Sequence, residues 1–275
     1  MRVVILTSHH NPGANIAVKT LLEHTALRKH AIEIVGIVSV GSFAFNQQGF
    51  RNFSRMIQRS GIGFTARLVL GTTAKSIFTR LTKWFVPRRH RSHFEINELA
   101  ARHGVPFLAV SDINAAKTLG WVRTKKPDYL ASAICMQILK KASLAIPKSG
   151  SINFHPALTH QHRGSFSAFW TLANRWRTAG ATVHFMTEKL DDGEVILQRH
   201  FFVHQSDTID CLNKRSAALG GRLLAKALVK LKKQRQHQAI KRRLGRLFSS
   251  PTRADVRDFD RRGGRIFRFW RLFRF

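Results

Sequence analysis

The feature that most constrains the fold is a short apolar run, followed by a helical pattern and then a second apolar run. Residues 2–6 (Arg-Val-Val-Ile-Leu) are rich in β-branched side chains and are followed by turn-prone residues at 8–13. This pattern is typical of a strand buried on both faces. Apolar side chains then recur at helical spacing, and a second strand-like run occupies 34–40. Strand, helix and strand in this order predict a βαβ unit with parallel strands.

The same alternation resumes later in the chain and extends the prediction. Apolar runs indicate strands, and amphipathic stretches indicate helices. The expected strands are 107–110, 129–134, 181–186 and 195–202, and the expected helices lie near 94–102, 115–123 and 208–231. Asp207 is the expected N-cap of the last helix. We therefore expect an α/β fold built on a mostly parallel sheet with helices on both faces.

Charge is the unusual part of the composition. The chain has 47 Lys and Arg against 15 Asp and Glu, a formal net charge of +32. A surface this basic attracts polyanions, so an anionic membrane, RNA or a phosphorylated small molecule are all candidate partners. Cys135 and Cys211 are too few for a disulfide framework or a thiolate zinc site. No stretch approaches the ~18 apolar residues that span a bilayer, so we expect a cytoplasmic protein, at most peripheral at the membrane.

A basic segment separates the two runs of alternation. Residues 34–94 contain ten Lys or Arg and no carboxylate, with apolar residues interleaved. We expect a basic helical insertion at about 45–93. One interpretation is a helical flap with a solvated basic face, and the other is an element that binds a membrane surface or a polyanion.

The end of the chain is also basic. Residues 232–246 carry seven Lys or Arg, and 251–275 carry eight Arg among many aromatics. We expect a domain at 1–205, a C-terminal helix and basic extension at 206–246, and an Arg/Phe-rich tail at 247–275. The aromatic side chains of this tail either dock on the domain or bind lipid or a partner.

The acidic residues are unusually concentrated. Four of the fifteen, Glu188, Asp191, Asp192 and Glu194, lie within seven residues between two predicted strands. An ordinary hairpin loop explains them, because Asp-Asp-Gly favours turns. A functional cluster is the alternative.

A second group of polar residues lies at 151–156, Ser-Ile-Asn-Phe-His-Pro. Strand alternation places the side chains of Asn153 and His155 on one face, and Pro156 ends the strand. Open α/β sheets bind ligands at the carboxyl ends of their strands. Taken alone, each residue is equally well explained as a hydrogen-bonding group of the core.

Together, these motifs resemble the catalytic half of the folate-dependent formyltransferases, which include glycinamide ribonucleotide, methionyl-tRNA and amino-sugar formyltransferases. The resemblance covers Tyr129 to Val203 and implies a Rossmann-like formyltransferase catalytic domain over 1–205. It also implies that 10-formyltetrahydrofolate donates a formyl group to an amine. The matching motifs are Met136 to Leu139, Asn153-x-His155-Pro156, Arg163-Gly164, Gly180 to His184, and Leu190 to Gly193.

The resemblance assigns the catalytic roles to Asn153, His155 and Asp191. Attack of an amine on a formyl carbonyl creates an oxyanion and an ammonium, so the site must donate hydrogen bonds and remove a proton. Asn153 supplies an amide N–H. His155, if Asp191 holds it protonated, supplies a charged donor, while the carboxylate orients it and helps to move the proton. Asp192 is the less favoured carboxylate, because the family pattern has Asp directly after Leu; no metal is required.

For the formyl donor, the resemblance implies an apolar slot formed by Met136, Ile138 and Leu139. Gln137 stands where the family frequently has Arg.

The first loop opens a helix at Gly13 and Asn15 and is a candidate anion-binding loop. It lacks the glycine-rich form of the glycinamide ribonucleotide enzymes, which disfavours that substrate. Methionyl-tRNA enzymes carry a further β-barrel domain, for which 203–275 are expected to be too short. A nucleotide-linked amino sugar is therefore the favoured acceptor. The alternatives are a methionyl-tRNA formyltransferase, a formyl-tetrahydrofolate hydrolase, and a non-catalytic polyanion- or membrane-binding protein on the same scaffold.

Overall fold

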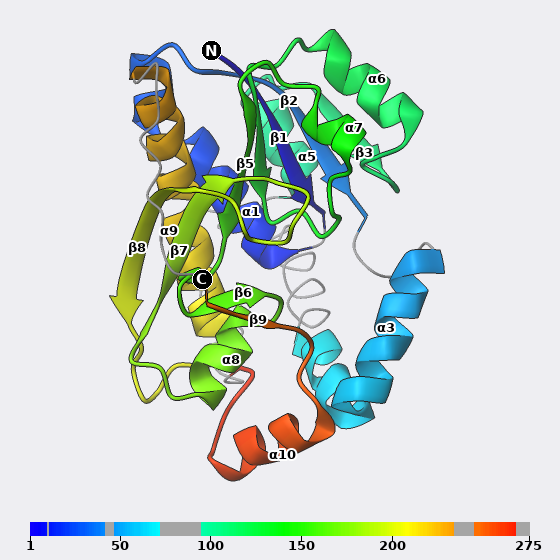
Figure 1. The fold of residues 1–275 in the computed structure, drawn as a ribbon, viewed down its shortest axis with the longest axis vertical. Helices are drawn as coiled ribbons and strands as arrows, with labels where there is room; N and C mark the ends of the chain where they lie inside the picture. The colour runs from blue at the N-terminus through cyan, green and yellow to red at the C-terminus, as the bar shows by residue number, and fades with distance from the viewer. Residues whose placement is uncertain (10, 42–46, 72–94, 234–244, 268–275) are drawn as a thin grey trace, which may run out of the picture.

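A seven-stranded sheet organises the molecule, in the order β3-β2-β1-β4-β5-β7-β8 (Figure 1). The computed structural model describes residues 1–9, 11–41, 47–71, 95–233 and 245–267. Neighbouring strands from β3 to β5 in this order are parallel. β7 pairs antiparallel with both β5 and β8. The predicted mostly parallel α/β sheet is confirmed. The strands are β1 (Arg2–Ser8), β2 (Glu33–Val40), β3 (Phe107–Val110), β4 (Tyr129–Ala133), β5 (Gly150–His155), β7 (Thr178–Phe185) and β8 (Val195–Phe202).

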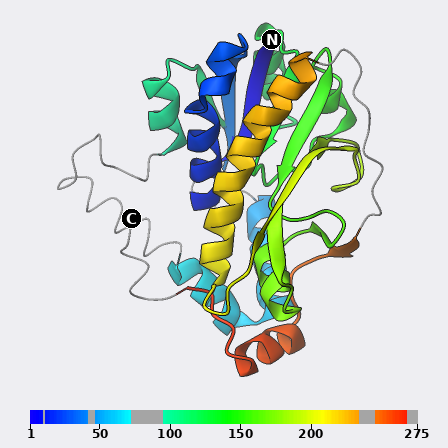
Figure 2. The ribbon, with the colours of Figure 1, turned by 90° about the vertical axis from the view of Figure 1, so that its left-hand side faces the viewer.

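Helices cover both faces of this sheet because alternate residues of its central strands point to opposite sides. Val3 and Ile5 of β1 share one apolar cluster with α1 (Pro12–Leu22), α5 (Ile96–Arg102) and α9 (Ile209–Lys233). Val4 and Leu6 share a second cluster with α6 (Ala116–Thr124) and α7 (Lys141–Leu144). Figure 2 shows α9 running beside α1 on one face. Every residue from Val3 to Leu6 is therefore buried, as the apolar run predicted.

The helical pattern after the first strand forms two helices rather than one. α1 ends at Leu22, and α2 (Thr25–Lys29) begins after His24, whose backbone is extended. The His24 ring accepts a hydrogen bond from the amide of Ala26 and thereby caps α2. This side-chain cap fixes a boundary that apolar periodicity alone does not show.

The expected N-cap of the last helix is wrong by one residue. The Thr208 hydroxyl accepts a hydrogen bond from the Cys211 amide at 3.2 Å, which is the N-cap interaction of α9. The Asp207 carboxylate instead accepts from the His204 amide at 2.9 Å and pairs with Arg215. It is engaged by the turn that precedes the helix.

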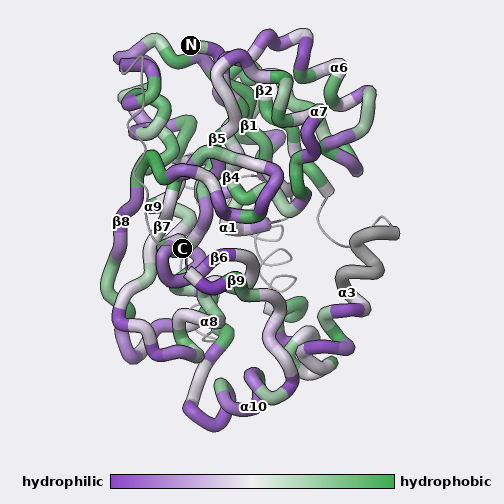
Figure 3. Tube along the Cα trace, viewed as in Figure 1, coloured by the Kyte–Doolittle hydropathy of each residue, from purple (hydrophilic) through white to green (hydrophobic). Residues whose placement is uncertain are grey.

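A third apolar cluster lies at the far end of the molecule. It joins the helical residues 62–71, α8 (Ser167–Ala173) and α10 (Arg253–Arg261), and its core contains Phe64, Phe169, Val256 and Phe259. α3 (Gln47–Ser60) contacts α10, and we call these four segments the distal lobe. The predicted helical insertion is confirmed for 47–71, and its remaining part at 72–94 lies outside the described residues. Figure 3 shows hydrophilic residues along most of α10 and hydrophobic ones within the central strands.

The C-terminal segment returns to the body of the protein. β9 (Arg246–Phe248) pairs in parallel with β6 (His162–Gly164), which lies close behind β5 in the chain. The predicted tail therefore begins inside an ordered strand. The basic residues at 234–244 and the end of the tail at 268–275 are not among the described ones. Within the described residues, no helix combines the length and the apolar character needed to cross a membrane.

Candidate functional site

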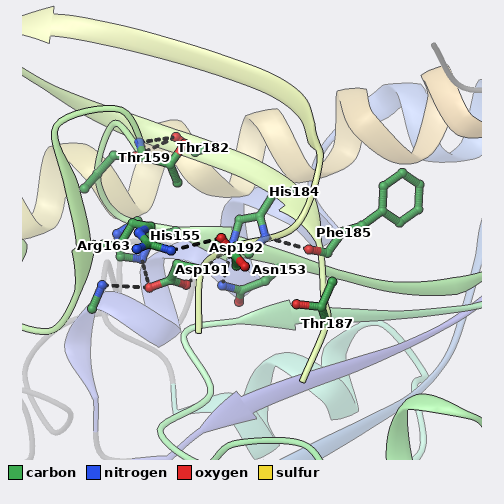
Figure 4. Close-up of polar contacts among 12 residues, drawn as sticks. Asn153, His155, Thr159, Arg163, Thr182, His184, Phe185, Thr187, Asp191 and Asp192 are labelled. Carbon is green, nitrogen blue, oxygen red and sulfur yellow. Dashed lines mark hydrogen bonds and ion pairs between the residues drawn. The ribbon is translucent and has the colours of Figure 1, made fainter. Parts of the chain in front are cut away.

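Asn153 and His155 lie at the carboxyl end of β5, between parallel β4 and antiparallel β7. In the β5–β7 pair, Asn153 is directly opposite His184. The Asn153 Nδ2 atom lies 3.3 Å from His184 Nε2 (Figure 4). The alternation of β5 also brings the buried His155 ring to the same end of the sheet.

Asp191 reaches these side chains from the turn between β7 and β8. Its backbone is left-handed, with a φ of 48°, and Gly193 lets the turn fold back closely onto Phe185. The carboxylate is buried: Oδ2 lies 3.4 Å from His155 Nδ1, and Oδ1 lies 3.5 Å from His184 Nε2. Oδ2 also accepts a hydrogen bond from the Gly164 amide at 2.8 Å. The structure thus brings together the three residues to which the resemblance assigned catalysis.

The neighbours of Asp191 favour its charged form. Burial alone raises the pKa of this carboxyl, but the imidazole rings of His155 and His184 and the Gly164 N–H lower it, and the net pKa lies well below the ordinary range. Asp191 is therefore a carboxylate at neutral pH.

The pKa of the His155 side chain is lowered, a direction that the sequence did not predict. Burial lowers the pKa of His155 more than the Asp191 charge raises it, and His184 lowers it further. The direction of this shift favours the neutral form of the His155 ring, because desolvation of the enclosed ring outweighs the attraction of the Asp191 carboxylate. It does not support the condition that Asp191 holds His155 protonated.

The hydrogen-bond partners assign a role to each ring nitrogen. We assign the proton of His155 to Nδ1, because this nitrogen faces the Asp191 carboxylate at 3.4 Å, and Nε2 then keeps its lone pair. Nε2 is buried and has no hydrogen-bond partner among the residues that the structure describes. His184 Nδ1 donates to the Phe185 carbonyl at 2.7 Å, and His184 Nε2 lies within reach of both Asn153 Nδ2 (3.3 Å) and Asp191 Oδ1 (3.5 Å). The site therefore offers a proton acceptor at His155 and an oriented amide at Asn153.

His184 is a member of this network that sequence reasoning placed in a motif but not in the site. The sequence did contain a signal for His184, because a histidine in a buried strand of small and apolar residues needs a polar partner. The pairing of β5 with β7 supplies that partner, and strand pairing is a tertiary property.

Asp192, the less favoured carboxylate, points elsewhere. It pairs with Arg163 at 3.0 Å, and the side chain of Asp192 is partly exposed. Two adjacent acids of one turn thus differ in role because the left-handed residue turns Asp191 inward.

The candidate donor-binding residues follow β4, next to the carboxyl end of β5. Met136 and Ile138 are 47% and 66% exposed, whereas Leu139 is buried in the second apolar cluster. Two of the three residues are therefore available to a ligand, and Leu139 anchors the loop.

Side chains from neighbouring loops hold this segment in place. Gln137 Oε1 accepts from the Ile113 amide at 2.8 Å. Asn114 Nδ2 donates to the Ile138 carbonyl at 3.0 Å, and Asn114 Oδ1 accepts from the Lys140 amide at 2.9 Å. Each of these bonds joins the loop after β4 to the loop after β3, so the exposed side chains project from a fixed backbone.

In the candidate anion loop, the amides of Gly13, Ala14 and Asn15 are already hydrogen-bonded. Asn11 Oδ1 accepts from the Gly13 and Ala14 amides, and the Asn11 carbonyl accepts from the Asn15 amide. Gly13 packs toward Ile134, where an added Cβ would lie 3.2 Å from its Cδ1. In this structure the Asn11 side chain caps the Gly13 amide, and the Asn15 amide makes the first backbone hydrogen bond of α1. Over the described ranges, no group of three or more His, Cys, Asp or Glu could hold a metal ion.

Comparison with known proteins gives one consistent result. The model of the family described as formyl transferase matches residues 70–228, more than half of the chain. A methionyl-tRNA formyltransferase of Thermotoga maritima is 33% identical over 137 residues, which cover 50% of this chain and 44% of that protein. The chain thus matches less than half the length of this relative.

Solved structures show the same fold. A phosphoribosylglycinamide formyltransferase from Anaplasma phagocytophilum gives a TM-score of 0.57 at 19% identity, covering 84% of this chain and 86% of that one. A sugar N-formyltransferase from Shewanella sp FDAARGOS_354 gives a TM-score of 0.56 at 16% identity, covering 90% and 76%.

Proposed function

The chain belongs to the formyl transferase family, and from this premise we propose that it transfers the formyl group of 10-formyltetrahydrofolate to a primary amine. The observation that carries the proposal is the pairing of the Asp191 carboxylate with His155 Nδ1 at 3.4 Å, which leaves Nε2 of the same buried ring without a partner. A buried nitrogen lone pair without a hydrogen-bond partner lowers the stability of the fold, so such a group is typical of a functional site.

The donor would be held at the loop after β4. The exposed side chains of Met136 and Ile138 offer an apolar surface that suits a flat heteroaromatic ring. The bound donor supplies the formyl carbon. Because β4 pairs with β5, the loop after β4 lies beside the strand end that carries Asn153 and His155. We propose that the formyl group of a donor bound on this surface reaches these two side chains.

The protein residues then divide the chemistry between them. The Asn153 amide nitrogen has two hydrogens, so it can bond to His184 and still donate to a carbonyl oxygen that gains negative charge. His155 Nε2 accepts the proton that the attacking amine loses as its nitrogen–carbon bond forms. The Asp191 carboxylate stabilises the resulting imidazolium, which returns the proton to the departing nitrogen of the donor as the old nitrogen–carbon bond breaks.

For the acceptor, we propose a phosphorylated amine, with a nucleotide-linked amino sugar as the first choice. The net charge of +32 favours an anionic substrate. The structural likeness to a sugar N-formyltransferase agrees with this choice. The identity to methionyl-tRNA formyltransferases makes methionyl-tRNA the second candidate, since the same charge also suits tRNA.

A panel assay separates these candidates. The full chain is incubated with 10-formyltetrahydrofolate and, in parallel, with amino-sugar nucleotides, with methionyl-tRNA or with no amine, and mass spectrometry follows the products. We expect one formylated amine for each tetrahydrofolate formed. Formate and tetrahydrofolate in the arm without amine would instead identify a hydrolase. Absence of donor turnover in every arm would contradict the proposal.

A further inference from the structure

The C-terminal segment 245–251, which we call the strap, lies against the catalytic side of the molecule. β9 within it pairs with β6 along three residues. The Gly245 amide donates to the Thr159 carbonyl at 2.8 Å, and the Ser165 amide donates to the Phe248 carbonyl at 3.1 Å. Backbone bonds at both ends thus fix the strap in register with β6.

The Phe248 ring begins a column of three stacked rings that ends at His155. The centroids of Phe248 and His162 are 5.0 Å apart with an interplanar angle of 2°. His162 and His155 follow at 5.8 Å and 13°. Trp170 and Trp176 contact Phe248, with centroids at 4.9 and 6.0 Å. The strap therefore supports the His155 ring through His162.

A second contact links the strap to the catalytic carboxylate. Gly164 of β6 donates its N–H to Asp191 Oδ2, and a Cβ added to Gly164 would lie 2.1 Å from the Phe248 carbonyl oxygen. Only the backbone of one strand separates the strap from Asp191. A displacement of the strap is thus transmitted to both partners of the His155–Asp191 pair.

The far end of the strap is tied to the distal lobe. Arg59 Nε donates to the Ser250 carbonyl at 2.7 Å, and the Ser60 hydroxyl donates to the Pro251 carbonyl at 2.6 Å. Both donors lie at the end of α3, in the basic insertion. The insertion and the C-terminal segment therefore meet at the strap.

We propose that Phe248 is a positioning residue for His155: the strap holds the Phe248 ring against His162 and so keeps the imidazole of His155 aimed at its reacting partner. The enzymatic consequence rests on the proposed formyl transfer, whereas the positioning itself can be measured without any substrate. The inference gives the C-terminal segment a part in the catalytic centre.

The first test observes the His155 ring directly. The full chain is labelled with ¹⁵N-histidine, and the His155 signals are assigned with a His155→Gln variant. In the wild-type protein we expect distinct shifts for a protonated Nδ1 and a bare Nε2. In Phe248→Ala these two shifts should move toward each other, because a ring without support samples both tautomers.

Three further variants make the test specific. Gly245→Ala displaces the strap without changing Phe248, since an added Cβ would lie 2.6 Å from the Gln161 carbonyl carbon, and it should reproduce the Phe248→Ala spectrum. Phe248→Tyr keeps the ring and should restore the wild-type shifts. Phe202→Ala makes the same truncation at a 67% exposed position and should change neither signal. If Phe248→Ala does not fold, Gly245→Ala and Phe248→Tyr still decide the question.

Folded Phe248→Ala and Gly245→Ala proteins with unchanged His155 shifts would overturn the inference, even if the His162 signals move. A kinetic arm, run with the amine identified in the panel assay, adds an independent readout. We expect kcat to fall at least tenfold in Phe248→Ala while KM for the formyl donor stays within twofold, and we expect Phe248→Tyr to recover kcat. A wild-type chain without transferase activity would contradict the proposed function. The NMR experiment would still test whether Phe248 positions the His155 ring.

Discussion

Asp191 Oδ2 accepts the Gly164 amide hydrogen at 2.8 Å and lies 3.4 Å from His155 Nδ1, so one carboxylate oxygen joins β6 to the ring at the end of β5. The geometry explains how a buried acid remains ionised beside a neutral imidazole. The backbone N–H compensates part of the desolvation, and the ring accepts a proton only when the chemistry delivers one.

Removal of the Asp191 charge should abolish most of the proposed turnover. In Asp191→Asn, the imidazolium that forms at His155 loses its counter-charge, and we expect kcat for formyl transfer to fall at least a hundredfold, about 3 kcal/mol. Asp192→Asn is the matched control, because this neighbour only pairs with Arg163 in a partly exposed position, and it should stay within threefold. Steady-state kinetics with circular dichroism checks both. Equal activity of Asp191→Asn and Asp192→Asn would remove the assignment.

His162 should make the protein less stable in mild acid. Burial, followed by repulsion from His155, lowers the pKa of His162 to about 4 from an unfolded value of 6.5. The native state therefore favours the neutral ring, so this stabilisation is complete above pH 6.5 and is lost as the pH falls toward 4, by up to about 3 kcal/mol. Urea unfolding across this range measures the slope.

His162→Phe keeps a ring in the stack but removes the titrating nitrogens, so its unfolding free energy should depend less steeply on pH. A residual slope from His155 is expected, because burial lowers the pKa of that ring as well. His204→Gln changes an exposed histidine and is the control with an unchanged slope. A wild-type slope in His162→Phe would contradict the assignment.

Asn114 should influence donor binding without entering the chemistry. It holds the loop of Met136 and Ile138 through bonds to the Ile138 carbonyl and the Lys140 amide. In Asn114→Ala we expect KM for the formyl donor to rise at least fivefold with kcat within twofold, since a loose loop costs binding entropy. Lys117→Ala, at an exposed position of α6, is the control with unchanged KM. A fall in kcat at unchanged KM would argue against this role.

Two glycines offer a test of the core with opposite expected signs. A Cβ at Gly220 of α9 would lie 2.1 Å from the Phe154 ring, so Gly220→Ala should destabilise the fold by roughly 1–3 kcal/mol. At Gly120 of α6 an added Cβ meets nothing within 4 Å, so Gly120→Ala should stabilise it by about 0.5–1 kcal/mol. Thermal unfolding compares the two. Stabilisation by both substitutions would show that helix propensity, not packing of α9 on β5, dominates, and destabilisation by Gly120→Ala would contradict the expectation for α6.

Local patterns in the chain were enough to predict the sheet and part of the site. The apolar run at 2–6 formed a strand buried on both faces, and the alternation around Asn153 and His155 placed both side chains at a strand end. Turn chemistry also located the acidic loop between β7 and β8. These features depend on residues close together in the chain, so the spacing of apolar and turn-forming residues is enough to predict them.

Other features depend on contacts between distant segments, and only the tertiary structure decided them. Strand pairing placed His184 opposite Asn153, and the return of the C-terminal segment stacked Phe248 on His162. Burial shifted the pKa of His155 opposite to the expected direction, because the desolvation of a ring depends on everything that encloses it. The sequence by itself thus determined which chemical groups are present and which strand ends carry them, whereas their partners and charge states were set by long-range packing.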